Sequence, residues 1–141
     1  MKSYSFATHI FLVNGVSIGG YDEGDDVIDL DRYNPSASHV IGADGEMSVS
    51  LSADRSGRAI FRLMKTSDSN QFLSALIASQ ENAAFIPVTL LIKDLDGNLL
   101  GAGTQGYITK PAGVTAGTNV TSREWEIAVE NLSLLDSSIT L

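Results

Sequence analysis

The chain has 141 residues, a length that suits one domain with its own hydrophobic core. It contains no cysteine, which excludes disulfide bonds, thiolate metal sites and a cysteine nucleophile. Seventeen acidic residues against nine basic ones give a formal net charge of −8, which disfavours direct binding to nucleic acid or to an anionic membrane. We expect no secretory signal peptide, and no apolar run in the sequence is long enough to span a membrane.

Most of the sequence alternates between apolar and polar residues, a period typical of strands. Residues 4–13 form the first predicted strand, and Asn14-Gly15 predicts the turn of a hairpin. Residues 21–45 are expected to form an extended acidic segment or loop. The acidic cluster at residues 22–31 could bind Ca²⁺, but it lacks the order of an EF-hand, so a solvated acidic loop is favoured.

Apolar and serine residues alternate at every step inside "GADGEMSVSLSADRSG" (42–57). The apolar positions are Met47, Val49, Leu51 and Ala53, and the serines are Ser48, Ser50 and Ser52. This alternation predicts a strand with one buried apolar face. Residues 58–65 are its expected hairpin partner.

The period changes to that of a helix in residues 67–82, where four large apolar residues share one face. They are Phe72, Leu73, Leu76 and Ile77. We predict one helix, roughly residues 69–80, that packs on a sheet. Asp68 and Gln71 resemble a capping box at its start.

Residues 84–110 predict a long hairpin that turns at Asp96-Gly97, with Pro87 marking an edge strand or the start of a strand. Residues 111–122 are an expected flexible loop. Residues 123–135 predict a last strand, in which Trp125, Ile127 and Val129 alternate with mostly acidic residues. The predicted fold is a single mainly-β domain: an antiparallel β-sandwich or barrel of about seven strands with one packed helix.

The run "GAGTQG" (101–106) matches the G-x-G-x-x-G pattern of dinucleotide-binding proteins. That pattern requires a helix directly after the glycines, whereas "YITKP" predicts a strand followed by a proline. We therefore interpret Gly101, Gly103 and Gly106 as a bent strand that another backbone or a neighbouring subunit approaches closely.

Catalytic patterns are weak in this sequence. His9 and His39 stand far apart, no serine lies in a nucleophile-elbow setting, and nothing selects a pair of carboxylates. We expect a protein that is not an enzyme and that holds no metal or cofactor.

Four of the nine basic residues surround one predicted hairpin: Arg55, Arg58, Arg62 and Lys65. A nucleic-acid site would also need interleaved aromatic residues, and Phe61 is the one aromatic residue nearby. We therefore expect an electrostatic contact with an acidic partner surface, and residues 22–31 of a second copy would supply one. Contact between two different patches produces rings or filaments.

Four blocks of the sequence together resemble a known family: "YDEGDDVIDLDR" (21–32), "GADGEMSVSLSADRSG" (42–57), "TSDSNQFLSAL" (66–76) and "GTQGYITKPAG" (103–113). In this order and spacing they are similar to bacteriophage tail tube proteins, particularly those of contractile-tailed phages. The resemblance extends from about residue 4 to residue 135.

The resemblance implies a structural virion protein whose hexameric rings stack into a hollow tube, with a fold shared with the inner tube of type VI secretion systems. Genomic DNA would pass through the lumen during ejection without specific binding. The partners would be further copies of the chain, a tail sheath, baseplate or tip proteins and a terminator. The location would be the virion tail, with assembly in the host cytoplasm.

Two sets of site residues follow as hypotheses. The candidates for subunit or ring contacts are Asp22, Glu23, Asp25, Asp26, Arg55, Arg58 and Arg62. The candidates for the lumen wall are Ser48, Ser50, Ser52, Glu124, Glu126 and Glu130, which could equally face solvent or a sheath on the outside.

Two other functions fit the same pattern. One is a related tube-like protein, either a tail terminator or a secretion-system tube protein. The other is a monomeric ligand- or carbohydrate-binding β-sandwich that would use Tyr21, Tyr33 and Tyr107 as its binding platform.

Overall fold

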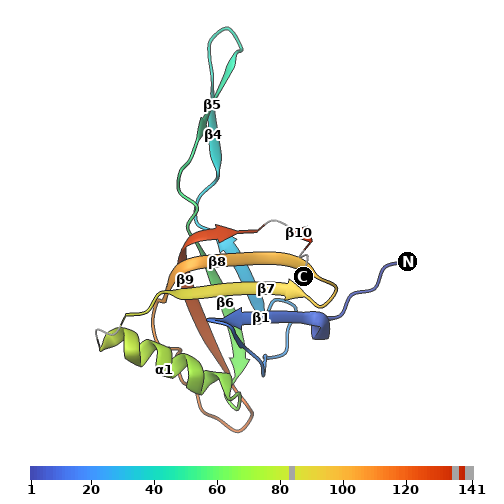
Figure 1. Cartoon of the computed structure of the whole chain (residues 1–141), viewed down its shortest axis with the longest axis vertical. Coiled ribbons are helices and arrows are strands. Elements are labelled where there is room, and N and C mark those ends of the chain that lie inside the picture. Colours follow the sequence, from blue (N-terminus) through green and yellow to red (C-terminus); the bar gives the residue numbers. More distant parts are fainter. Residues whose placement is uncertain (83–84, 135–136, 139–141) are drawn as a thin grey trace.

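The computed structural model describes residues 1–82, 85–134 and 137–138. Its main feature is an eight-stranded sheet with the strand order β2-β1-β7-β8-β9-β6-β3, in which β10 pairs with β8 (Figure 1). The elements are η1 (Phe6–Thr8), β1 (His9–Val13), β2 (Val16–Ser17), β3 (Ile28–Arg32), β4 (Ala37–Ile41), β5 (Met47–Leu51), β6 (Gly57–Met64), α1 (Ser69–Glu81), β7 (Val88–Asp94), β8 (Asn98–Ile108), β9 (Ser122–Ser133) and β10 (Ser137–Ser138). The predicted fold class is confirmed, because the described part is mainly antiparallel β-structure with one α-helix.

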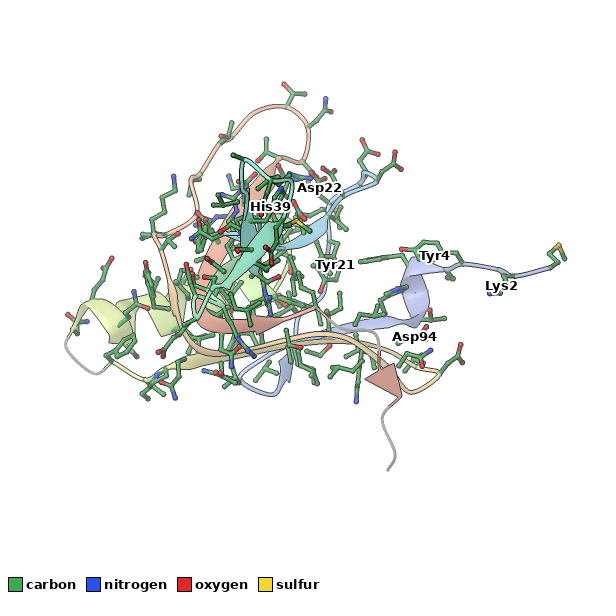
Figure 2. The ribbon with its side chains drawn as sticks, turned by 90° about the horizontal axis from the view of Figure 1, so that it is seen from above. Lys2, Tyr4, Tyr21, Asp22, His39 and Asp94 are labelled. Atoms are coloured by element: carbon green, nitrogen blue, oxygen red, sulfur yellow. The ribbon has the colours of Figure 1, made fainter. Side chains whose placement is uncertain are left out.

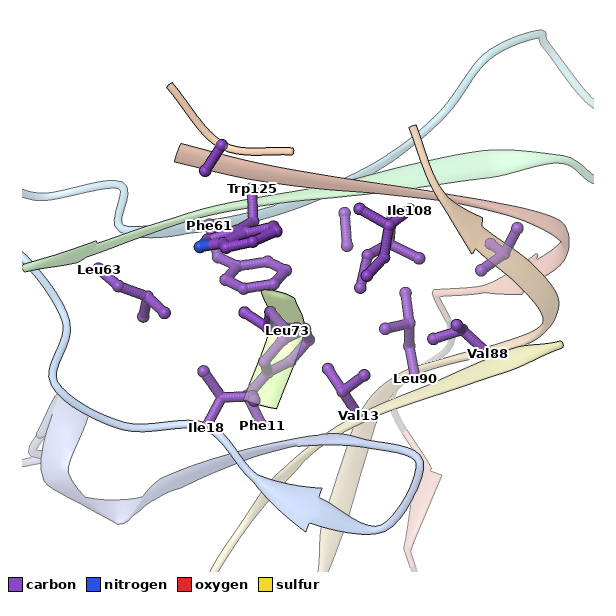
Figure 3. Packing of buried hydrophobic residues seen from close by; sticks show 14 of the residues in the cluster. Phe11, Val13, Ile18, Phe61, Leu63, Leu73, Val88, Leu90, Ile108 and Trp125 are labelled. Atoms are coloured by element: carbon purple, nitrogen blue, oxygen red, sulfur yellow. The ribbon is translucent and has the colours of Figure 1, made fainter. Parts of the chain in front are cut away.

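The sheet curls around a single core. Phe11 of β1 and Phe61 of β6 have ring centroids 5.1 Å apart, although three strands separate β1 from β6 in the sheet order. Only a strongly bent sheet can bring these two positions together, and Figure 3 shows both side chains inside the core. Trp125 and Ile127 of β9 are fully buried in the same cluster.

The bend passes through the glycines of β8. A Cβ atom at Gly106 would lie 2.7 Å from Val129 Cγ1 and 2.9 Å from the carbonyl oxygen of Ala128. Gln105 beside it has a positive φ of 57°, and the β7–β8 register shifts at this point. The predicted bent strand with a close backbone neighbour is confirmed, and β8 leads into no helix.

Helix α1 begins at the predicted residue and ends one residue later than expected. Leu73 and Ile77 are buried in the core, and Asn70 is buried beside them. The predicted capping box is wrong, because the Asp68 side chain makes no capping hydrogen bond. The backbone N–H of Ser69 instead donates to Ser67 Oγ (3.2 Å). Within the described residues no helix is long and apolar enough to cross a membrane.

The largest departure from the sequence prediction is the hairpin formed by β4 and β5. These strands form a separate two-stranded sheet that projects from the main sheet (Figure 1). Strand β5 was expected to bury its apolar face and to pair with residues 58–65, and both expectations are wrong. All five β5 residues are exposed, and β6 pairs with β3 and β9. Alternation assigns residues to faces, but it does not identify what covers a face.

Other predicted boundaries need smaller corrections. The first strand begins at His9, and β3 and β4 occupy much of the predicted acidic loop. Pro87 precedes β7, which lies between β1 and β8 and is therefore a strand start rather than an edge. Residues 84 and 135 of the predicted strands lie outside the described residues.

The two predicted turns are present. Asn14 and Gly15 both have positive φ (51° and 79°), as a two-residue hairpin turn requires. At the Asp96-Gly97 turn, Gly97 alone of the pair has a positive φ (93°).

Candidate functional site

The β4–β5 hairpin has one apolar face and one serine-rich face. Residues that pair directly across antiparallel strands share a face. The pairs on the apolar face are Ala37 with Leu51, His39 with Val49, and Ile41 with Met47. Leu51 is 84% exposed and Val49 is 57% exposed, so no described part of the chain covers this face. Contiguous exposed apolar surfaces are typical of sites that contact other molecules.

The predicted serines Ser48 and Ser50 lie on the opposite face, where they pair with Val40 and Ser38. Ser52 follows the strand, and its backbone N–H donates to the carbonyl oxygen of Ser36 (2.9 Å). The serines therefore belong to the projecting hairpin and not to the main sheet (Figure 1).

Hydrogen bonds fix the two ends of the hairpin. At the tip, the Gly42 backbone N–H donates to the Glu46 carbonyl oxygen (2.7 Å), and Asp44 Oδ1 accepts from the Glu46 N–H (3.1 Å). At the base, the Asp54 carboxylate accepts from the Ser56 hydroxyl (2.6 Å), the Ser56 N–H (2.9 Å) and Asn34 Nδ2 (2.7 Å). These donors, the Ser56 hydroxyl first, lower the pKa of Asp54 from its ordinary value.

The structure brings part of the predicted acidic and basic sets together within one chain. Arg62 lies 2.7 Å from the Asp26 carboxylate and 3.6 Å from that of Glu124. Arg58 lies 3.8 Å from the carboxylate of Glu126. Because Asp26 is 79% exposed in its side chain, its ion pair with Arg62 contributes little stability. Arg55 lies apart from these pairs at the hairpin base, where its carbonyl oxygen accepts from the Leu132 N–H (2.8 Å).

The outer face of the β3–β6–β9 part of the sheet is strongly charged. Arg58 and Arg62 of β6 point away from the core, as do Glu124 and Glu126 of β9. Glu130 is exposed further along β9. Asp29 and Asp31 of β3 also belong to this face, because they pair with Ile60 and Arg58. Neither residue is among the lumen candidates predicted from the sequence. Their alternation with Ile28 and Leu30 in the sequence indicates that both carboxylates lie on one face of a strand. It does not indicate that this strand lies beside β6.

Two exposed tyrosines extend this charged face. Tyr107 pairs with Ala128 of β9, and the Tyr33 ring lies 6.0 Å from the Arg58 guanidinium carbon. The pKa of Tyr33 is raised chiefly by partial burial, then by the negative charge of Glu126, while Arg58 acts in the opposite direction. Tyr21 instead lies near Phe6, and its hydroxyl donates to the Ile18 carbonyl oxygen (2.8 Å). The three tyrosines therefore do not form one platform.

No metal-binding cluster emerges from the part of the chain that the structure describes. Within these residues, no three His, Cys, Asp or Glu side chains are grouped closely enough to hold a metal ion. His39 lies on the hairpin, whereas His9 lies in β1, where its ring centroid is 5.3 Å from that of Tyr4. Figure 2 shows Tyr4 well apart from His39. The remaining acidic candidates, Asp22, Glu23 and Asp25, border a hollow of about 320 Å³ together with Tyr4, Phe6 and His9.

Comparison with solved structures supports the fold. The chain is similar to the tube-terminating cap of the anti-feeding prophage, with a TM-score of 0.57 and 6% identity over 97% of this chain and 93% of that chain. It is also similar to the sheath/tube terminator of the extracellular contractile injection system PVC in its extended state. That match has a TM-score of 0.56 and 12% identity over 96% of this chain and 98% of that chain. At these identities the likeness shows a shared fold.

Comparison at the sequence level identifies the family. The search among curated proteins found no match. A family model described as "Bacteriophage PhiTE tail tube protein" matches residues 1–135, which is nearly the whole chain. The chain therefore belongs to the PhiTE family of bacteriophage tail tube proteins.

Proposed function

We propose that this chain is a non-enzymatic structural subunit whose copies form hexameric rings that stack into the hollow tube of a phage tail. The observation that carries this proposal is the β4–β5 hairpin, which exposes a row of apolar side chains along one face. Burying that face against a second copy would offset its exposure to water. The β2 and β3 edges of the main sheet offer further backbone groups for pairing within a ring.

The charged outer face of β3–β6–β9 is our candidate for the channel wall. Asp29, Asp31, Glu124 and Glu126 outnumber Arg58 and Arg62 on it, and both arginines are engaged by carboxylates. A wall of this charge repels phosphate groups, so DNA would pass without being held. Because the serine face lies on the projecting hairpin, we do not include Ser48 and Ser50 in this wall. A sheath, baseplate or tip proteins and a terminator would complete the tail.

The assembly role is tested by adding one negative charge to either hairpin face. We expect the wild-type chain to form rings or tubes in negative-stain micrographs. Val49→Asp should prevent their formation, because it places a carboxylate on the apolar face. Ser50→Asp is the matched control on the opposite face, and it should leave more assembly intact than Val49→Asp does. A wild-type chain that stays monomeric at high concentration would contradict the proposal.

A tube terminator is the second candidate, since both solved structures described above are terminators or caps of contractile systems. The two roles predict different assemblies of the purified chain. A tube subunit should form stacks of many rings, whereas a terminator should form single rings that bind to the end of an existing tube.

A further inference from the structure

The tip of the β4–β5 hairpin carries unbalanced negative charge. Asp44 and Glu46 are exposed, and residues 36–53 contain no lysine or arginine. The hydrogen bonds within the tip involve backbone N–H groups and hold the loop in one shape. Both acidic residues therefore lie at the far end of an element that itself stands away from the sheet (Figure 1).

A positively charged surface lies at the end of strands β6 and β9 that is farther from the hairpin. Strand β6 begins at Gly57 near the hairpin base and leads to Lys65, while β9 begins near Arg123 and returns to the base. The backbone N–H of Lys65 donates to the Thr121 carbonyl oxygen (2.8 Å), which joins the two strands at that end. Eight residues of β6 span roughly 26 Å at the usual rise per residue. The hairpin and the Lys65 end therefore lie at opposite ends of the main sheet (Figure 1).

Lys65 and Arg123 border a hollow of about 420 Å³ beside the start of α1. Thr66, Asn70 and Gln71 add polar groups to its lining, and Asp68 is its acidic member. Neither Lys65 nor Arg123 takes part in the ion pairs found among the described residues. The first turn of α1 contains no acidic residue beyond the N-cap, and the N-cap Asp68 partly offsets the positive end of the helix dipole.

Arg123 is held in place without using all of its donors. One of its terminal nitrogens donates to the Ala112 carbonyl oxygen (2.9 Å), and its guanidinium carbon lies 5.3 Å from the centroid of the Trp125 ring. Its Nε is buried and has no hydrogen-bond partner among the described residues. The guanidinium of Arg123 is thus held in position, and no carboxylate among the described residues forms an ion pair with it.

We propose that Asp44 and Glu46 of one copy bind the hollow at Lys65 and Arg123 of a second copy, stacked head to tail on the first. This inference rests on the proposed tube function and names the acceptor for the hairpin tip. Because the two surfaces are different and lie at opposite ends, the contact repeats in one direction without closing on itself. The apolar hairpin face would contribute buried area, while the charges would set register and direction.

A charge exchange tests the pairing. Glu46→Lys and Lys65→Glu should each slow tube growth about tenfold, because each places like charges together. The double variant should grow within about threefold of the wild-type rate, because it restores the opposite charges. Asp96→Lys and Lys110→Glu are matched controls at exposed positions outside both surfaces, and they should grow like the wild type. Thermal unfolding of each single variant would show that the fold is retained.

Cross-linking gives a second, independent test, because the chain has no cysteine of its own. A mixture of Glu46→Cys and Lys65→Cys copies should be linked into dimers when assembled tubes are treated with a bismaleimide, whose spacer bridges a separation too long for a direct disulfide. Neither variant alone should be linked, because the proposed contact joins the hairpin tip of one copy to the Lys65 hollow of the next.

The outcomes separate the two proposals. If the wild type forms tubes but the charge variants grow normally and the mixture does not cross-link, the acceptor is wrong while the tube function stands. If the wild type forms no tubes, the proposed function and this inference both fail.

Discussion

Gly106 of β8 lies between Val88 of β7 and Val129 of β9, and both strands approach it closely. A methyl group there would meet the Val129 side chain and the carbonyl oxygens of Ala128 and Val88, at 2.7 to 3.0 Å. We expect Gly106→Ala to lower the free energy of unfolding by about 1–3 kcal/mol, because the backbone on both sides must move. Urea denaturation would measure this loss. Gly113→Ala is the control, since no atom lies within 4 Å of its added Cβ. Equal stability of the two variants would contradict the packing argument.

The ionisation of Asp54 makes the stability of the hairpin base depend on pH. Its pKa is held below the ordinary value, so its ionised form stabilises the base at neutral pH, and that contribution is lost as the pH falls through the lowered pKa. We predict that Ser56→Ala raises the pKa of Asp54, because it removes the strongest donor. A carbon-detected NMR titration of the carboxyl group would show the change. Ser36→Ala, which removes no donor to Asp54, should leave the pKa unaltered.

The buried amide of Asn70 joins the start of helix α1 to the sheet, while the amide of Gln80 bonds the backbone of Ile108 near the other end of the helix. Asn70 Oδ1 accepts from Trp125 Nε1 (3.0 Å), and Asn70 Nδ2 donates to the Met64 carbonyl oxygen (2.9 Å). Asn70→Ala should cost about 1–3 kcal/mol of unfolding free energy, because it leaves the buried indole N–H without a partner. Chemical denaturation would test this, with exposed Gln71→Ala as the matched control. A loss no larger than that of the control would show that the amide is dispensable.

Local patterns predicted the type of most elements. Helical spacing placed α1 to within one residue, and the glycines of β8 correctly indicated a bent strand. Alternation also assigned Met47 and Val49 to one face of β5 and Ser50 to the other. It could not show that β5 leaves the main sheet, because an apolar face has the same pattern whether its own core or a second molecule covers it.

The candidate site was less predictable, because it depends on strands that are distant in sequence. The acidic and basic groups were recognised separately, yet only the fold shows that Arg62 contacts Asp26 of its own chain. Asp29 and Asp31 join the charged face because β3 pairs with β6, and sequence alone did not indicate that pairing. Local periodicity carries no information about which strands become neighbours.

At the scale of the whole molecule, the charge of the β3–β6–β9 face should affect the passage of DNA through the tube. We expect Glu126→Lys to leave tube formation intact and to slow DNA passage, because it adds positive charge to the proposed channel wall. Release of labelled DNA from assembled virions at several salt concentrations would measure this. Asp96→Lys provides the same charge change in an exposed turn. If Glu126→Lys instead abolished sheath attachment and left ejection normal, this face would belong on the outside of the tube.

The connection between the hairpin and the main sheet has a mechanical consequence. Two short segments, residues 33–36 and 52–56, join the two-stranded sheet to the eight-stranded one, and the Asp54 hydrogen bonds lie within them. In a stack joined through hairpins, this narrow neck would be the most compliant part of each copy. The filament could then curve by flexing at the necks while every ring keeps its shape. Its bending stiffness would be set by a few hydrogen bonds at the hairpin base, largely independently of the core.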